Sequence, residues 1–375
     1  MSETADVQRC TFRIASADGV ELAVHHYHSG RGAARGTVIL VHGLLATSEI
    51  FDVPGGKCFS LARALAEGGF HVVTYDQRGA GDSTAGSPDF GLFEHALVDL
   101  PAVIEFAVHL DAHAPGPIVL GGHSLGGLLI YLQQIAARRL DEQRVGPWVQ
   151  SIFTIAGPAS FDTAWSPWNL IARGGHDLVR RLDPDSDGMV TRAEFVAGQT
   201  QLCWPVLGRL VRPAAVGFVI RLGCAFPLLA PLLLHAPLPT FIYGRKDFAP
   251  KCFAEILRSR VLDAASRQIL DELVVATRSG GRLTLDAFGT PLSIPDDLPT
   301  LRGIRLLTVT SAGDALVPFQ SVQEAHKWLP GRSVLTEQAY GIDSGHAGYL
   351  FRPGLCDRVA QDILAFCAAT GNAPD

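Results

Sequence analysis

Two kinds of hydrophobic pattern alternate along the chain. Short continuous apolar runs are typical of strands that are buried on both faces of a sheet. Longer segments with apolar residues every three or four positions are typical of helices. The apolar runs lie at 36–42, 70–75, 118–120, 149–155 and 304–310, and the helical segments lie at 59–67, 92–113, 125–136 and 356–367. This order predicts an α/β protein with a mostly parallel sheet and helices on both of its faces.

Two segments depart from this pattern. Residues 9–28 alternate apolar and polar side chains around the turn Ala17-Asp18-Gly19, which predicts an antiparallel hairpin at one edge of the sheet. Within 92–113, Pro101 is expected to break or kink the helix, because proline has no backbone N–H to donate. The sheet is therefore expected to be parallel except at this edge.

Composition restricts the classes of function. The chain has 375 residues, of which 47% are hydrophobic, so it can bury a large core. Its formal net charge is −6 and no run of lysine or arginine is present, so we expect no nucleic-acid partner. The first 19 residues lack a basic start followed by an apolar core, so we expect no secretory signal and, by default, a cytoplasmic location.

The cysteines suggest no covalent framework. Their number is odd and no two of them form a CxxC pair, which favours reduced, mostly buried thiols over disulfides or a zinc site. The seven positions are Cys10, Cys58, Cys203, Cys224, Cys252, Cys356 and Cys367.

The stretch 117–136 runs from a strand through a very tight turn into a helix, and Ser124 lies at the turn. Gly122 and Gly126 stand where a Cβ would collide with the neighbouring strand and helix. The free amide of Leu125 and the positive end of the helix dipole would face an oxyanion formed by Ser124. The pattern predicts a serine nucleophile, with an ordinary glycine-rich turn as the alternative.

Three motifs together resemble the α/β-hydrolase family. They are HG at 42–43, DQRGAGDS at 76–83 and GHSLGG at 122–127, in the order and at the spacing found in that family. The resemblance covers about residues 9–160 and 300–370. It implies an α/β-hydrolase fold in which the amides of Leu44 and Leu125 form the oxyanion hole. Asp76 and Arg78 would then be structural.

The same resemblance implies a catalytic triad. Asp314 follows the apolar run 304–310, and His346 precedes the last helical segment, which gives the family's chain order of Ser124, Asp314 and His346. His346 would take the proton of the serine hydroxyl, and Asp314 would orient the imidazole. An ordinary turn aspartate is the alternative for Asp314, and Asp343 is the reserve candidate.

The chemistry implied is cleavage of an ester with an apolar acyl part, and it needs no cofactor. The motifs are most similar to lipase-type and polyester-polymerase-type members, but the polymerases carry cysteine where this chain has Ser124, which argues against that chemistry. Two other functions remain open. One is acyl transfer by the same triad, and the other is calcium-dependent binding without catalysis on the same scaffold.

The middle of the chain does not share the resemblance. We divide the chain into a first core part at 1–157, a helical cap at 158–300 and a second core part at 301–375. Within the cap, 206–234 is very apolar, but arginines and prolines interrupt it, so no uncharged run in it reaches the roughly 18 residues that a membrane-spanning helix needs. It is expected to cover a small-molecule or lipid-like ester substrate, or to rest on a lipid surface.

The cap also contains an acidic loop at 183–194. Counted from Asp183, carboxylates stand at positions 1, 3, 5 and 12, a glycine at 6 and a hydroxyl at 9, which is the spacing of an EF-hand calcium loop. The expected ligands are Asp183, Asp185, Asp187, the Met189 carbonyl, Thr191 and Glu194. The pattern predicts one structural Ca²⁺ that stabilises the cap, with an acidic surface turn as the alternative.

Overall fold

The computed structural model describes most of the two predicted core parts and a portion of the predicted cap. The described residues are 7–30, 34–110, 116–161, 176–177, 179–195, 197, 247–329, 334–340 and 344–370. The apolar segment 206–234 and the reserve candidate Asp343 lie outside the described residues.

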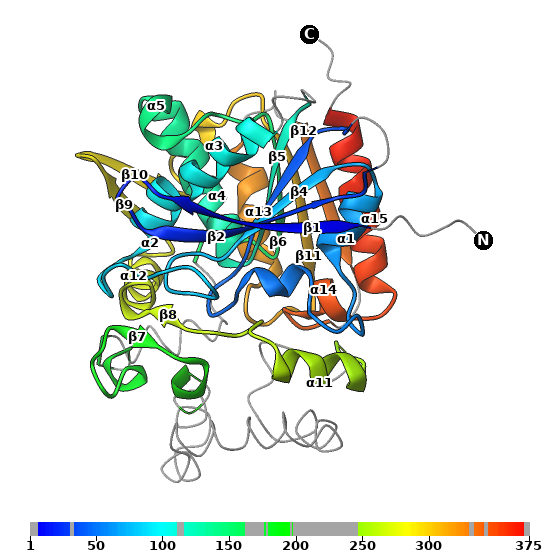
Figure 1. The fold of residues 1–375 in the computed structure, drawn as a ribbon. Helices are drawn as coiled ribbons and strands as arrows, with labels where there is room; N and C mark the ends of the chain where they lie inside the picture. Colours follow the sequence, from blue (N-terminus) through cyan, green and yellow to red (C-terminus); the bar gives the residue numbers. More distant parts are fainter. Residues whose placement is uncertain are drawn as a thin grey trace.

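An eight-stranded sheet forms the centre of the molecule (Figure 1). β1 pairs antiparallel with β2, and β2 pairs antiparallel with β4, whereas all other neighbours are parallel. The α/β fold and its antiparallel edge hairpin are therefore confirmed. In spatial order the strands are β1 (Gln8–Ala15), β2 (Glu21–His28), β4 (His71–Tyr75), β3 (Thr37–Val41), β5 (Ile118–His123), β6 (Ser151–Ile155), β11 (Arg305–Ser311) and β12 (Val334–Tyr340).

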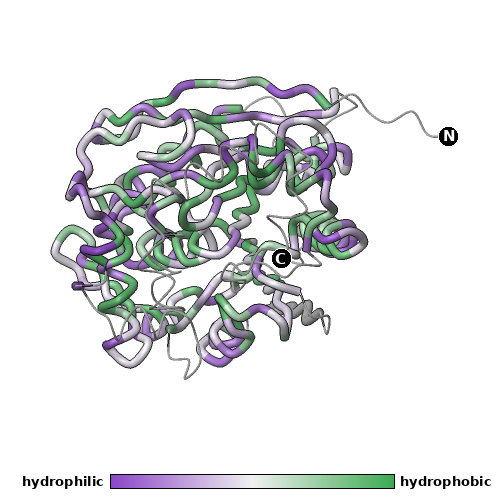
Figure 2. Tube along the Cα trace, turned by 90° about the horizontal axis from the view of Figure 1, so that it is seen from below, coloured by the Kyte–Doolittle hydropathy of each residue, from purple (hydrophilic) through white to green (hydrophobic). Residues whose placement is uncertain are grey.

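Helices cover both faces of this sheet, and β3 shows how its side chains divide between them. Val38 and Leu40 pack in the apolar cluster that contains α1 (Leu61–Glu67) and α15 (Leu355–Thr370). Ile39 and Val41 pack in a second cluster with α3 (Leu100–Leu110) and α4 (Leu125–Arg139). Figure 2 shows the apolar segments gathered inside the molecule. A strand buried on both faces requires the continuous apolar run that predicted it.

The helix around Pro101 is altered rather than ended. A short α2 (Leu92–Glu94) continues into a π-helical turn at His95–Asp99, and α3 begins at Leu100. The change of helix type lies directly before the proline, which has no N–H for the normal backbone hydrogen bond. The expected disturbance at Pro101 is thus local.

Residues 247–300 lead the chain back to the sheet. They form α11 (Pro250–Arg258), β8 (Ala265–Ser266), α12 (Arg267–Arg278), β9 (Leu283–Ala287) and β10 (Thr290–Ile294). Residues 290–294 are more than a connection back to the core, because β10 pairs antiparallel with β9 and buries Leu292 and Ile294. These two residues alternate with Pro291 and Ser293, so a short strand could have been read from the pattern.

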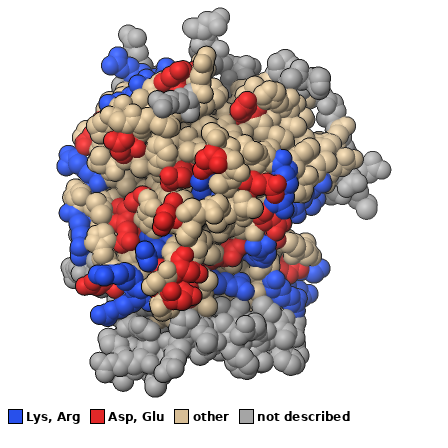
Figure 3. Space-filling view, turned by 60° about the vertical axis from the view of Figure 1, so that its left-hand side comes forward, with Lys and Arg blue, Asp and Glu red and all other residues tan. Residues whose placement is uncertain are grey.

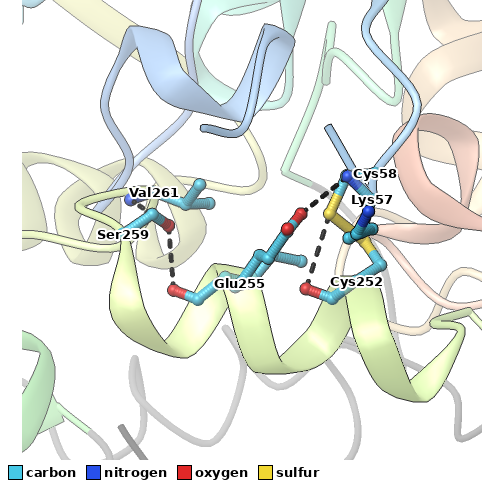
Figure 4. Close-up of a disulfide and its surroundings, with 7 residues drawn as sticks. Lys57, Cys58, Cys252, Glu255, Ser259 and Val261 are labelled. Atoms are coloured by element: carbon cyan, nitrogen blue, oxygen red, sulfur yellow. Dashed lines mark hydrogen bonds between the residues drawn. A yellow bond between two sulfur atoms is a disulfide. The ribbon is translucent and has the colours of Figure 1, made fainter. Parts of the chain in front are cut away.

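The prediction of reduced cysteines is wrong for one pair. Cys58, in the loop before α1, forms a disulfide with Cys252 of α11, across a sequence separation of 194 residues (Figure 4). Beside it, the Lys57 amide donates a hydrogen bond of 2.8 Å to the Glu255 carboxylate. Among the described residues, Cys10 is an exposed free thiol, and Cys356 and Cys367 are buried free thiols. The pairing depends on a contact between distant segments, which the spacing of cysteines does not reveal.

The surface carries charges of both signs. On the face seen in Figure 3, acidic and basic side chains alternate over the described residues without forming a large patch of one sign. Among the described helices, none combines the length and the hydropathy needed to cross a bilayer. The predicted cytoplasmic location and lipid contact stay predictions.

Candidate active site

Ser124 lies at a sharp turn between β5 and α4. Its backbone has φ 55° and ψ −123°, which is strained for a residue with a side chain, and the residue is partly exposed. A Cβ at Gly126 would lie 2.1 Å from the Val41 carbonyl oxygen, and one at Gly122 would lie 2.4 Å from the Gly126 carbonyl carbon. Both positions therefore need glycine for the close approach of strand and helix that the sequence predicted.

The loop after β3 lies directly against this turn. A Cβ at Gly43 would lie 2.9 Å from the Ser124 Cβ. The His42 Nε2 accepts a hydrogen bond of 3.0 Å from the Gln77 amide, so its Nδ1 carries the proton and donates to the Gly43 carbonyl at 2.9 Å. Burial lowers the pKa of His42 to about 4, so the ring is neutral near pH 7.

This histidine fixes the orientation of one candidate oxyanion donor. In a trans peptide the C=O and the following N–H point in opposite directions. Since the Gly43 carbonyl is held by His42, the Leu44 N–H is directed away from that ring. Leu125, the other predicted donor, is the first residue of α4, where amides lack acceptors within the helix. Both predicted amides therefore belong to segments that border Ser124.

A short segment before β8, at 260–263, contacts the loop after β3 from the other side. The Asp263 amide donates to the Leu45 carbonyl at 2.9 Å, and the Thr47 amide donates to the Val261 carbonyl at 3.1 Å. Ala46 and Leu262 form the antiparallel bridge between them. This segment belongs to the chain that returns from the predicted cap, so that chain is bonded directly to the loop that carries Leu44.

Asp314 and His346 meet at the same edge of the sheet. The His346 Nδ1 lies 2.9 Å from the Asp314 Oδ2, and both side chains are buried. The other Asp314 oxygen accepts from the amides of Leu316 at 3.1 Å and Val317 at 3.0 Å. The Tyr349 hydroxyl donates to Oδ2 at 3.3 Å. Four donors thus surround a carboxylate that sequence reasoning proposed only from chain order.

The second ring nitrogen of His346 is not used in the contact with Asp314. Its Nε2 is buried and has no hydrogen-bond partner among the described residues. The ring centroid lies 4.8 Å from that of His123, the residue before Ser124, and the His123 Nε2 donates to the His346 carbonyl at 3.3 Å. Burial lowers the pKa of His123 to about 3, so its ring stays neutral beside the His346 ring.

Asp76 and Arg78 make structural contacts. The Asp76 carboxylate accepts from the amides of Ser48 and Asp82, each at 2.8 Å. Arg78 is buried and pairs with Asp99 and Asp18. The Asp76 contact with Ser48 joins the loops after β3 and β4, and Arg78 joins the second of these loops to the turn of the first hairpin and to the π-helical turn.

Three side chains around the site are absent from the sequence-based prediction. They belong to His123, Tyr349 and Asp247. Tyr349 lies three residues after His346, a spacing that places both side chains on one side of a helical turn. Asp247 lies 98 positions before Gly345, whose amide it accepts from, so no pattern in the neighbouring sequence points to it.

The acidic loop brings three of its predicted ligands together. Carboxylate oxygens of Asp183, Asp185 and Asp187 lie within 4.8 Å of one another. Asp183 is buried, its oxygens accept from the amides of Asp187 and Gly188, and Arg267 pairs with it at 2.7 Å. Hard oxygen donors at this spacing fit the chemistry of Ca²⁺.

Of the remaining predicted ligands, Thr191 and Glu194 contact each other within the loop, and Met189 lies in a strand that pairs with another segment. The Glu194 carboxylate accepts from the amide and the hydroxyl of Thr191, both at 2.8 Å, and is not part of the group of three. Met189 lies in β7 (Met189–Val190), which pairs antiparallel with β8. Leu45, in the loop after β3, packs in one apolar cluster with Val179 and Leu182 before the acidic loop, Val190 within it and Phe195 directly after it.

Comparison with known proteins supports the fold. The family model for the alpha/beta hydrolase fold matches residues 36–169. No curated protein sequence matches the chain. The fold of this chain is an α/β-hydrolase fold.

Solved structures of esterases have a similar fold at low sequence identity. A putative aryl esterase from Burkholderia cenocepacia has 20% identity and a TM-score of 0.56, covering 97% of this chain and 100% of the other. An esterase from Exiguobacterium antarcticum has 14% identity and a TM-score of 0.54, covering 96% and 99%. Brefeldin A esterase, a bacterial homologue of human hormone-sensitive lipase, has 16% identity and a TM-score of 0.54, covering 99% and 79%.

Proposed function

We propose that this protein is a serine hydrolase that cleaves carboxylic esters through an acyl-Ser124 intermediate. The observation that carries the proposal is the 2.9 Å contact between His346 and Asp314, beside a serine held at a strained turn. Such a pair activates a hydroxyl that is otherwise a weak nucleophile. The esterases among the similar structures support this class of reaction.

The proposed reaction uses only groups of this chain. The Ser124 oxygen attacks the ester carbonyl while its proton passes to the His346 Nε2, and Asp314 stabilises the imidazolium. The carbonyl oxygen becomes an oxyanion that accepts hydrogen bonds from the Leu44 and Leu125 amides. The alcohol leaves with the proton from His346. Water then attacks the acyl group in the same way and restores the free serine.

The proposed substrate is an ester with an apolar acyl part. The apolar sequence 206–234, in the predicted cap at 158–300, supports this choice, because an acyl chain needs an apolar surface to bind. A lipid-like ester fits the same description. Acyl transfer to an alcohol, amine or thiol would use the same intermediate, so analysis of the products with and without such an acceptor separates the two reactions.

We further propose that the acidic loop binds one structural Ca²⁺. Asp183, Asp185 and Asp187 would supply carboxylate oxygens, Met189 a carbonyl, and Thr191 and Glu194 the remaining ligands. The ion would neutralise carboxylates that repel one another, and it would take no part in ester cleavage. The grouping of the three aspartates supports this proposal.

Kinetics of Ser124→Ala test the proposed function. Turnover of nitrophenyl esters is expected to fall at least about 10³-fold with an unchanged melting temperature, because the nucleophile is lost and the fold is kept. Esters with longer acyl chains are expected to be preferred over acetate by the unmodified protein. Retained turnover in Ser124→Ala would refute the proposal, and a strict preference for acetate would refute the apolar acyl site.

A further inference from the structure

We propose that Asp247 is a positioning residue that holds the loop carrying His346. This inference rests on the proposed serine hydrolase function, since it concerns the orientation of the proposed base. Asp247 lies just before α11, in the chain that returns from the predicted cap, and it is completely buried. A buried carboxylate needs hydrogen-bond donors, so the residues that donate to it are the ones whose positions it fixes.

Two of these donors come from the residues directly before His346. The Gly345 amide donates to the Asp247 Oδ2 at 2.9 Å. The Ser344 hydroxyl donates to the Asp247 Oδ1 at 3.2 Å, and Ser344 is itself buried. Hydrogen bonds to a charged acceptor in buried surroundings are the stronger ones. Each carboxylate oxygen of Asp247 thus fixes one residue of the histidine loop.

The loop closes tightly around this carboxylate. The Gly348 amide donates to the Gly345 carbonyl at 3.0 Å. A Cβ at Gly348 would lie 1.8 Å from the Ser344 Oγ and 2.6 Å from the Asp247 Oδ1, so only a hydrogen atom fits there. Asp247 therefore lies inside the turn 344–348, which packs around it without spare volume.

The other contacts of His346 fix different parts of the residue. Asp314 holds its ring through Nδ1, and His123 holds its carbonyl. Asp247 holds the two residues that lead into it. A shift of the turn by a fraction of an ångström would change the distance between the His346 Nε2 and the serine oxygen, and proton transfer depends steeply on that distance.

Asp247 also lies where cap and core are joined. The rings of Phe248 and Phe351 have centroids 5.4 Å apart, which docks the return segment against α14 (Gly348–Phe351). Further along the same segment, Cys252 is bonded to Cys58, and residues 260–263 contact the loop after β3, which carries Leu44. The return segment therefore contacts the loop of the proposed base as well as the loop of a proposed oxyanion donor.

The inference is tested by kinetics of Asp247→Ala with a nitrophenyl ester. We expect kcat to fall about 10- to 100-fold while KM changes less than about threefold, because the base is displaced and the substrate surface is not. Asp247→Asn keeps a carbonyl acceptor for the Gly345 amide, so it should recover most of the loss. The matched control is Asp286→Ala, which removes an exposed carboxylate that accepts from the Gly289 amide at 2.8 Å, and it should leave kcat unchanged.

A double-mutant cycle separates positioning from general destabilisation. In a His346→Ala background there is no imidazole to position, so adding Asp247→Ala should leave the residual rate unchanged. An equal loss in both backgrounds, or a loss confined to KM, would overturn the inference. If Asp247→Ala does not fold, Ser344→Ala removes one of the two hydrogen bonds, and an unchanged kcat in that variant would overturn it. If the proposed serine hydrolase function itself were wrong, Ser124→Ala would retain turnover, and that result would distinguish its failure from a failure of the Asp247 inference.

Discussion

The His346 Nδ1 and the Asp314 Oδ2 lie 2.9 Å apart in a buried site, although the two residues are 32 positions apart in the sequence. The contact exists because β11 ends at Ser311 and delivers Asp314 to the sheet edge where the loop before α14 also lies. It fixes the proton of the neutral imidazole on Nδ1 and leaves Nε2 as the acceptor.

Asp314→Asn tests this tautomer. The amide group of asparagine can donate to Nδ1, which would place the ring proton on Nε2 and prevent it from accepting the serine proton. We expect kcat for a nitrophenyl ester to fall about 10³- to 10⁴-fold, with the protein still folded by circular dichroism. A loss of less than tenfold would show that Asp314 does not serve the proposed base.

Calcium is expected to stabilise the protein through the acidic loop. Saturation at about 100 times the Kd should raise the free energy of unfolding by about 2.7 kcal/mol, measured by thermal unfolding with calcium and with a chelator. Because Leu45 packs with Val179 and Phe195, chelation should also lower kcat. Identical melting curves, together with no heat of calcium binding in calorimetry, would contradict the proposed ion.

Asp185→Asn separates the effect of calcium binding from other effects on stability. Asp185 is exposed and belongs to the group of three carboxylates, whereas Asp183 also accepts amide hydrogen bonds and pairs with Arg267. Substitution of Asp185 should therefore remove the calcium-dependent gain without weakening the calcium-free protein. Asp286→Asn, on the β9–β10 turn, should keep the full gain.

The disulfide between Cys58 and Cys252 should contribute to stability. The double variant Cys58→Ser and Cys252→Ser is expected to lower the free energy of unfolding by about 2–4 kcal/mol, because the cross-link restricts the unfolded chain. Denaturant unfolding measures the difference, and Cys10→Ser, at an exposed free thiol, is the control that should change nothing. Recovery of both cysteines as free thiols in a non-reducing peptide map would contradict the cross-link.

Stability is expected to fall as the pH is lowered below 6.5. Burial is the main cause that lowers the pKa of His26 and of His42 to about 4, from 6.5 in the unfolded chain. Above pH 6.5 neither state is protonated, so these histidines have no effect there. Between pH 6.5 and 4 only the unfolded state binds their protons, so the free energy of unfolding falls by about 1.4 kcal/mol per pH unit for each histidine.

His26→Phe separates this contribution from others. His26 lies on β2, which β4 and β3 separate from the strand β5 before Ser124, and its Nε2 is buried without a partner among the described residues. In this variant, the free energy of unfolding should fall less steeply between pH 6.5 and 4, by about 1.4 kcal/mol per pH unit. Denaturant unfolding at pH 7.5, 6 and 5 measures this slope. An equal slope in His26→Phe and in the unmodified protein would contradict the assignment.

Local patterns predicted the sheet and the serine turn, because both depend on neighbouring residues. The buried strand 36–42 and the glycines around Ser124 are examples, since each reflects sterics within a few positions. The contacts of Cys58 with Cys252 and of Asp247 with Gly345 join segments 194 and 98 positions apart, and single-sequence patterns carry no trace of them. Asp314 was reached only through the order of motifs in a resembling family.

The central claim is that Ser124 is a nucleophile activated by His346. Its most direct test is labelling with a fluorophosphonate at neutral pH, followed by mass spectrometry of the peptide that contains residue 124. One label per chain on Ser124, at a rate that falls at least about 10³-fold in His346→Ala, is the predicted result. No label on Ser124, or labelling at the same rate without His346, would contradict the account.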